Sequence, residues 1–87
     1  MISSTTSPRF WRCYLALPQA IRPATRKTYR LWQLNPAHPS LEFKKLGRVW
    51  SCRIAGTGYR ALACKEGEIL VWFWIGSHDD YERLLGG

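Results

Sequence analysis

The sequence predicts an α+β domain in which an N-terminal helical hairpin packs on one face of a four-stranded antiparallel sheet. Two observations support this class. Residues 1–40 carry apolar side chains at helical spacing and end in a proline-rich segment, NPAHP. Residues 41–75 form short β-rich segments separated by turns of two or three residues, and such turns join antiparallel neighbours. With 87 residues, the chain is expected to form a single domain over 1–87.

The first helix is expected to follow a serine–proline pair. Residues 1–7 are polar, and we expect them to be disordered. Ser7 suits a helix N-cap, and Pro8 suits the first helical position, because the N–H that proline lacks has no intrahelical partner there. The pattern predicts a helix over residues 9–17.

The second helix is expected over residues 19–34. Pro18 interrupts the first helix, and Pro23 is compatible with the second helix only within its first turn. Segment 35–39 ends this helix, because residues that precede proline avoid the helical conformation. The two helices then form a hairpin.

The rest of the chain predicts a meander of four strands and a short C-terminal helix. The strands are expected at residues 41–46, 49–55, 59–65 and 68–75. The last strand contains seven consecutive apolar residues, Ile69 to Ile75, which is typical of a strand buried on both faces. A helical segment is expected over 79–85.

The charge is high and unevenly distributed. The net charge is +7, and residues 1–65 hold twelve Lys and Arg side chains against a single acid, Glu42. A small, strongly basic domain usually binds a polyanion or an acidic protein. The alternative is that the charge only keeps the domain soluble.

The composition predicts a cytoplasmic protein. No run approaches the ~20 apolar residues that cross a bilayer, and the N-terminus lacks the apolar segment of a signal peptide, so no membrane partner is expected. The three cysteines include no CxxC pair, which argues against a disulfide framework and a zinc site. We therefore expect reduced thiols and neither a metal nor a cofactor.

Two arginines are candidates for anion binding. Arg53 and Arg60 each lie within a largely apolar strand, and a charged group in that setting needs a partner or a bound anion. The partner is expected to be either Glu42 or Glu68. The alternative is that these arginines stabilise a phosphate, or the charge that develops on it during a reaction.

A histidine next to the buried strand is the candidate for proton transfer. His78 follows this strand closely, and histidine is the side chain whose ordinary pKa lies nearest to neutrality. It could act as a general acid or base beside Arg60. Alternatively, it caps the strand or binds Asp79 or Asp80.

Other cations are candidates for RNA contacts. Arg22, Arg26 and Arg30 form one ridge on the second helix, which is either a solvated face or a phosphate-binding one. Lys44 and Lys45 point to opposite faces of a strand, so only one of them can reach a site on the sheet.

Four segments resemble the RelE/ParE superfamily of toxins from bacterial type II toxin–antitoxin systems, in particular RelE-like and YafQ-like members. They are HPSLEFKKL, VWSCRI, GYRALA and WFWIGSHDDYERLL. The resemblance implies a metal-independent, ribosome-dependent mRNA endoribonuclease that inhibits translation and is silenced by an antitoxin. It also leaves open a ParE-like toxin that binds DNA gyrase, or an inactive member that binds only an antitoxin or nucleic acid. The N-terminal strand that many members carry before the first helix is expected to be absent or vestigial here.

The resemblance also implies roles for individual residues. Arg60 matches the strand arginine that holds the scissile phosphate, and His78 matches the C-terminal residue of the acid–base chemistry. Arg53 would help to orient the RNA backbone, and the ridge on the second helix would contact ribosomal RNA. The remaining candidates for RNA binding are His38, Lys44, Lys45 and Tyr81.

The expected partners are the ribosome with its mRNA and a cognate acidic antitoxin. An acidic, partly disordered peptide would complement this basic surface and become ordered on binding. DNA gyrase is the alternative target.

Overall fold

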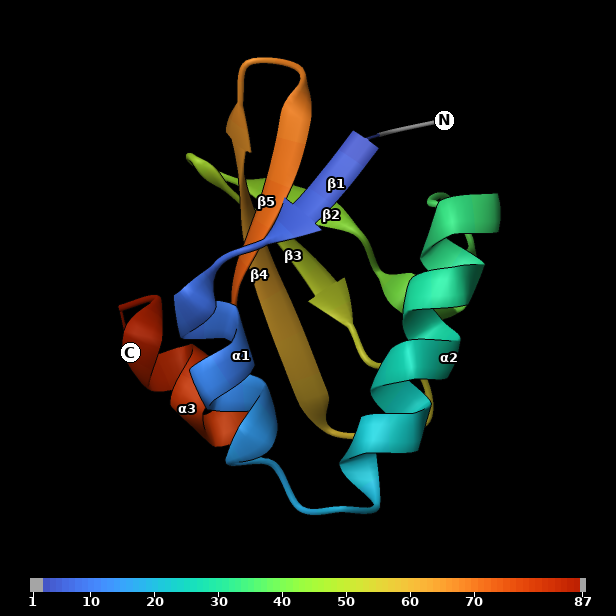
Figure 1. The fold of residues 1–87 in the computed structure, drawn as a ribbon, viewed down its shortest axis with the longest axis vertical. Helices are drawn as coiled ribbons and strands as arrows, with labels where there is room; N and C mark the ends of the chain where they lie inside the picture. Colours follow the sequence, from blue (N-terminus) through green and yellow to red (C-terminus); the bar gives the residue numbers. More distant parts are fainter. Residues whose placement is uncertain (1–2, 87) are drawn as a thin grey trace.

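The computed structural model describes residues 3–86 as a five-stranded sheet with helices on both of its faces (Figure 1). This confirms the predicted α+β class. The elements are β1 Ser3–Thr6, α1 Pro8–Leu15, α2 Ile21–Leu34, the 3-10 turn η1 Pro39–Leu41, β2 Lys44–Leu46, β3 Val49–Arg53, β4 Tyr59–Glu66, β5 Ile69–Ser77 and α3 His78–Leu84.

Strands β2 to β5 form the predicted antiparallel meander, and the strand order of the whole sheet is β1-β5-β4-β3-β2. The first meander strand begins at Lys44 and not at residue 41, because the 3-10 turn η1 extends to Leu41. Two of the turns depend on glycine. Gly47 joins β2 to β3 and Gly67 joins β4 to β5, with φ angles of 62° and 61°. Tight hairpin turns require this left-handed backbone, which glycine adopts without a steric penalty.

The fifth strand, β1, corrects three expectations: that the sheet has four strands, that residues 1–7 are disordered and that the N-terminal strand is missing. Ser3–Thr6 pairs in parallel with β5, from Ser3 opposite Ile69 to Thr6 opposite Trp72. The hydroxyl groups of Ser4 and Tyr29 of α2 are 2.6 Å apart, which ties the strand to the second helix. Residues 1–2 lie outside the described part. An edge strand of Ser and Thr has no apolar pattern, so its sequence resembles that of a frayed terminus.

Strand β5 packs side chains into the cores on both faces of the sheet, as predicted, although Ile69 at its start is exposed. Its pairing with β4 contains an irregularity. The register shifts between the pairs Leu62–Trp74 and Ala63–Trp72. Trp72 therefore joins the core beneath α1 and α2, whereas Trp74 joins a second cluster on the other face. In a regular strand these two tryptophans would share one face.

Helix α1 begins as predicted but ends earlier than residue 17. The Ser7 hydroxyl accepts a hydrogen bond from the backbone N–H of Phe10, and Pro8 is the first helical residue. The helix ends at Leu15, because Ala16 and Leu17 form 3-10-type hydrogen bonds that lead the chain into Pro18.

Helix α2 begins at Ile21, so Pro23 falls in the first turn, where its missing N–H removes no hydrogen bond. Its main anchor is Trp32, which is 1% exposed. The indole of Trp32 makes edge-on contacts with Trp72 of β5 and with Phe43, at centroid distances of 5.3 and 5.7 Å. This contact places α2 on the same face of the sheet as α1, which confirms the predicted packing of the hairpin.

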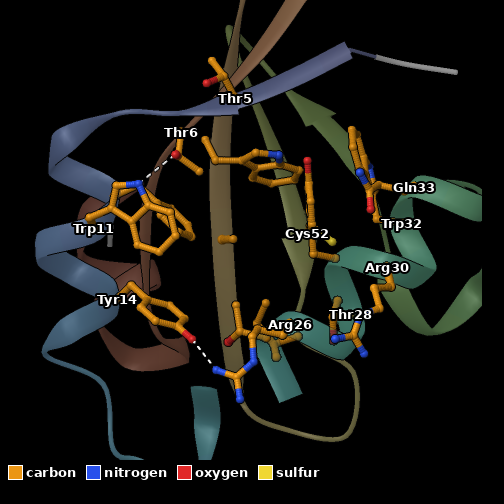
Figure 2. A pocket seen from close by; sticks show the side chains of 16 residues that line it. Thr5, Thr6, Trp11, Tyr14, Arg26, Thr28, Arg30, Trp32, Gln33 and Cys52 are labelled. Carbon is orange, nitrogen blue, oxygen red and sulfur yellow. Dashed lines mark hydrogen bonds between the residues drawn. The ribbon is translucent and has the colours of Figure 1, made fainter. Parts of the chain in front are cut away.

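The two helices of the hairpin diverge and leave a pocket of about 620 Å³ above the sheet. Figure 2 shows α1 on one side of this pocket and α2 on the other. Two side-chain hydrogen bonds join residues that line it: the Trp11 indole donates to the Thr6 hydroxyl at 2.8 Å, and Arg26 donates to the Tyr14 hydroxyl at 2.8 Å.

Helix α3 lies on the opposite face of the sheet. It begins at His78, directly after β5, and the Ser77 hydroxyl caps it by accepting a hydrogen bond from the Asp80 N–H. Tyr81 of α3 is buried against Leu62 and Trp74. None of the helices within residues 3–86 has the length and apolar character needed to cross a membrane.

The close approach of Trp74 to the backbone at Gly76 gives a testable prediction. A Cβ atom at residue 76 would lie 2.5 Å from Cζ2 of Trp74. We expect Gly76→Ala to lower the free energy of unfolding by about 1–3 kcal/mol, because the indole must move out of a packed position. Urea denaturation measures this loss.

Gly58→Ala is the matched control, because a Cβ there meets no atom within 4 Å. Its effect should stay within about 0.5 kcal/mol. Equal losses for the two variants would contradict this account of Gly76.

Candidate phosphate-binding site on the open sheet face

The strand register brings several of the candidate cations to the face of the sheet opposite α1 and α2. Arg53 lies directly opposite Arg60, and Lys44 lies opposite Ser51. Residues that are opposite each other, or two apart along a strand, share a face, so Lys44, Arg53 and Arg60 all point to the side that carries α3. Lys45 pairs with Trp50 and points to the other side.

Arg60 is held against α3 and is largely buried. Its guanidinium carbon lies 5.0 Å from the ring centroid of Tyr81, and only 15% of its side chain is exposed. Its Nη2 donates a hydrogen bond of 3.0 Å to Oε1 of Glu42. Nη1 is buried without a hydrogen-bond partner among residues 3–86. The guanidinium therefore retains donor capacity that the folded chain does not use.

Glu42 is the acidic partner of both strand arginines. Its Oε1 lies 3.0 Å from Nη2 of Arg60 and 3.9 Å from Nη1 of Arg53. Of the two partners expected from the sequence, Glu42 and Glu68, Glu42 forms the ion pair. Arg53 is the more accessible arginine, with 45% of its side chain exposed.

The backbone of Glu42 is left-handed, with φ 42° and ψ 43°. Glu42 follows η1, and within residues 3–86 every other residue with positive φ is a glycine. A left-handed conformation costs a residue with a side chain about 1–2 kcal/mol, so contacts elsewhere must compensate for it.

His78 lies beside Tyr81 at the start of α3. The two rings stack at a centroid distance of 6.0 Å, and Nε2 of His78 is 3.1 Å from Oε1 of Glu82. The imidazole thus pairs with the acid one turn along α3 instead of the expected Asp79 or Asp80. About half of the side chain is exposed, which leaves it accessible to a ligand. The Tyr81 ring therefore contacts both Arg60 and His78.

Other candidates lie away from this group. Arg22 donates to the carbonyl oxygen of Leu15 at 2.7 Å, and Arg26 donates to the hydroxyl of Tyr14. Both contacts join α2 to α1 on the opposite side of the sheet. Arg30 lines the pocket between these helices (Figure 2). The geometry thus separates the ridge on α2 from Arg60.

His38 has a structural contact at the start of η1. Its Nδ1 accepts a hydrogen bond of 3.2 Å from the N–H of Ser40 and lies 2.8 Å from the Ser40 hydroxyl. This ring nitrogen therefore serves the turn that leads to Glu42.

Sequence reasoning treated Glu42 only as an ion-pair partner and missed its central position. One signal in the sequence could have found it, because Glu42 is the single acid among the first 65 residues. Residues 3–86 contain no group of three or more His, Cys, Asp and Glu side chains that could hold a metal ion. The side-chain groups present at this face are guanidinium, ammonium, imidazole, phenol and carboxylate.

Solved structures of RelE toxins share this fold. A chain of the RelB–RelE antitoxin–toxin complex from Methanococcus jannaschii aligns with a TM-score of 0.68 and 14% identity, over 91% of this chain and 95% of that chain. The isolated E. coli RelE toxin aligns with a TM-score of 0.63 and 12% identity, over 97% and 99%. A chain of the RelE–RelB complex from Pyrococcus horikoshii aligns with a TM-score of 0.65 and 13% identity, over 88% and 96%.

No family model and no curated protein matches the sequence. The chain therefore has the fold of the RelE toxins, with a sequence far from theirs. This confirms the fold that the sequence resemblance implied.

The thiol of Cys52, in the core on the other side of β3, gives a prediction about reactivity. Burial raises the pKa of Cys52 from 9.0 to about 12, and the positive charge of Arg60 opposes this rise only in part. Because the thiolate is the reactive form, Cys52 should stay unreactive at pH 8 in the folded protein. Cys13 and Cys64 are partly exposed, so two of the three thiols should react.

Titration with a chromogenic disulfide reagent, before and after denaturation, counts these thiols. A third thiol that reacts as quickly as the others in the folded protein would contradict the buried position of Cys52.

Proposed function

We propose that this chain is the toxin of a type II toxin–antitoxin pair and that it cleaves mRNA on the ribosome, in the cytoplasm. The observation that carries this proposal is the convergence of Arg53 and Arg60 on one carboxylate oxygen at the open face. The half-exposed imidazole of His78 lies on the same side of the sheet, where it stacks on Tyr81, the residue that also contacts Arg60. Two guanidinium groups at one acidic oxygen are the arrangement that also suits a phosphate group. The RelE fold supports the same class of activity.

The reaction is the attack of a ribose 2′-oxygen on its own 3′-phosphate. The 2′-hydroxyl loses a proton, a new bond forms between the 2′-oxygen and phosphorus, and the bond from phosphorus to the 5′-oxygen breaks. The leaving 5′-oxygen gains a proton, so the products are a 2′,3′-cyclic phosphate and a 5′-hydroxyl. These proton movements require a group that can exchange protons near neutral pH.

The residues divide this work by their chemistry. Arg60 holds the scissile phosphate and stabilises the negative charge that grows on it, while Arg53 and Lys44 orient the RNA backbone. His78 exchanges a proton with one of the two ribose oxygens. Tyr81 supports Arg60 and His78 through its ring.

The proposed partners are the ribosome with its mRNA and an acidic antitoxin. In the similar structures from M. jannaschii and P. horikoshii, RelE is found in complex with RelB. The charge of this chain favours the same kind of partner, because residues 1–65 contain one acid against twelve basic side chains.

Arg60→Ala and His78→Ala test the proposal. Induction of the wild-type chain in cells should produce new mRNA 5′ ends at codon boundaries. Each variant should reduce cleavage by about 10²–10⁴-fold, since each loses a charge-stabilising or proton-transfer group. Mapping of mRNA ends after induction measures this effect.

Arg48→Ala is the matched control, because it removes an exposed arginine from the turn between β2 and β3. It should cleave like the wild type. Unchanged transcripts on induction of the wild type would reject the nuclease.

Arg60→Ala and His78→Ala, compared with Arg26→Ala in the hairpin, separate the nuclease from a gyrase-binding toxin. In that alternative the hairpin of α1 and α2 contacts the target, so toxicity would be lost in Arg26→Ala and kept in Arg60→Ala and His78→Ala. No toxicity in any form, with a purified antitoxin still bound, would indicate an inactive member.

A further inference from the structure

The carboxylate of Glu42 lies against both strand arginines of the candidate phosphate site. Its Oε1 faces both Arg60, at 3.0 Å, and Arg53, at 3.9 Å. These two arginines come from neighbouring strands, and the register places them directly opposite each other. The only acid of residues 1–65 therefore occupies the point where two of the cations converge.

This ion pair leaves much of the binding capacity of the arginines unused. A single oxygen, Oε1, serves both guanidinium groups, and the distance to Arg53 is too long for a hydrogen bond. Nη1 of Arg60 is buried and has no partner within the described residues. A phosphate offers more acceptor oxygens than this one carboxylate oxygen, and it can bind two arginines at once.

The backbone indicates that Glu42 is held in this place at a cost. Its φ of 42° lies in a region that, within residues 3–86, is otherwise occupied by glycine alone. Nearly half of the Glu42 side chain is exposed, at 44%, so it can swing toward solvent without leaving a cavity in the core. The carboxylate can therefore move away from the two arginines without disturbing the packing of the core.

We infer that Glu42 is an internal competitor at the phosphate site: its carboxylate occupies the position between Arg53 and Arg60, and an RNA phosphate binds only by displacing it. This inference rests on the proposed function and assigns Glu42 a regulatory role at the same site. In the free protein Glu42 neutralises part of the arginine charge, and binding of RNA exchanges one anion for another. Glu42 thereby weakens RNA binding and limits it to RNA that other contacts also hold.

Two roles for Glu42 predict opposite results on neutralisation. If the carboxylate only positions Arg60, its loss leaves the guanidinium unsupported and RNA binding weakens. If it competes with phosphate, its loss frees both arginines and RNA binding strengthens. Glu42→Gln separates the two roles, because glutamine keeps the size of the side chain and removes the charge.

The binding experiment uses the full chain and a short, fluorescein-labelled single-stranded RNA with 2′-O-methyl groups throughout, which cannot be cleaved. Fluorescence anisotropy at one fixed salt concentration gives the affinity. We expect Glu42→Gln to bind this RNA about tenfold more tightly than the wild type, since a like charge at the phosphate site is removed. Inorganic phosphate should also compete more effectively against RNA on this variant.

Glu68→Gln is the matched control, because it makes the same change of charge in an exposed turn between β4 and β5. Its affinity should rise by about twofold or less, since screening weakens the effect of a distant surface charge. An affinity for Glu42→Gln at or below that of Glu68→Gln would overturn the inference.

Two further variants keep the test decisive. Glu42→Asn also removes the charge, and asparagine tolerates the left-handed backbone, so it should bind RNA more tightly than the wild type even if Glu42→Gln folds poorly. In the Arg60→Ala background the gain from Glu42→Gln should largely disappear. A gain that persists in full would overturn the inference.

The single variants, each compared with the wild type, separate this inference from the proposed function. If Arg60→Ala weakens RNA binding but neutralising Glu42 does not strengthen it, the competitor role is wrong and the phosphate site stands. If Arg60→Ala leaves RNA binding unchanged, the phosphate site itself is wrong, and the competitor role with it.

Discussion

The pairing of β4 with β5 determines where the groups of the candidate site lie. Its register places Arg60 opposite Gly76 and Leu62 opposite Trp74. Because β5 leads directly into α3, the helix folds back over the same face, and Tyr81 packs on Leu62 and Trp74. The arginine is then held between a strand and an aromatic ring. A shift of one residue in this pairing would turn Arg60 toward the hairpin and remove the site.

The electrostatics of this face follow from the same placement. Register brings Arg53 next to Arg60, and two neighbouring guanidinium groups repel each other unless an anion lies between them. Glu42 provides that anion in the free protein, from the segment that leads into β2. The site is therefore preorganised for negative charge. The anion that it holds in the free protein is the carboxylate of Glu42, a residue whose backbone has the unfavourable left-handed conformation.

Much of this arrangement was accessible from the sequence, and the misses have physical reasons. Local signals were sufficient to predict the start of α1, because serine is typical of a helix N-cap and proline of the first helical position, as Ser7 and Pro8 are. The polar strand Ser3–Thr6 was missed because an edge strand needs no apolar pattern. The choice between Lys44 and Lys45 depends on register, which only the pairing of β2 with β3 sets. As the single acid of residues 1–65, Glu42 could be expected to pair with an arginine, but its left-handed backbone has no signal in the sequence.

The central claim is that anions bind between Arg53 and Arg60 on the face that carries α3. Titration of the protein with inorganic phosphate, followed by NMR of the arginine side-chain Nε–H groups, tests this claim most directly. The account predicts that the resonances of Arg53 and Arg60 shift together and saturate, while those of Arg22 and Arg26 stay in place because they are bound within the hairpin. Saturable shifts confined to the hairpin arginines would contradict it.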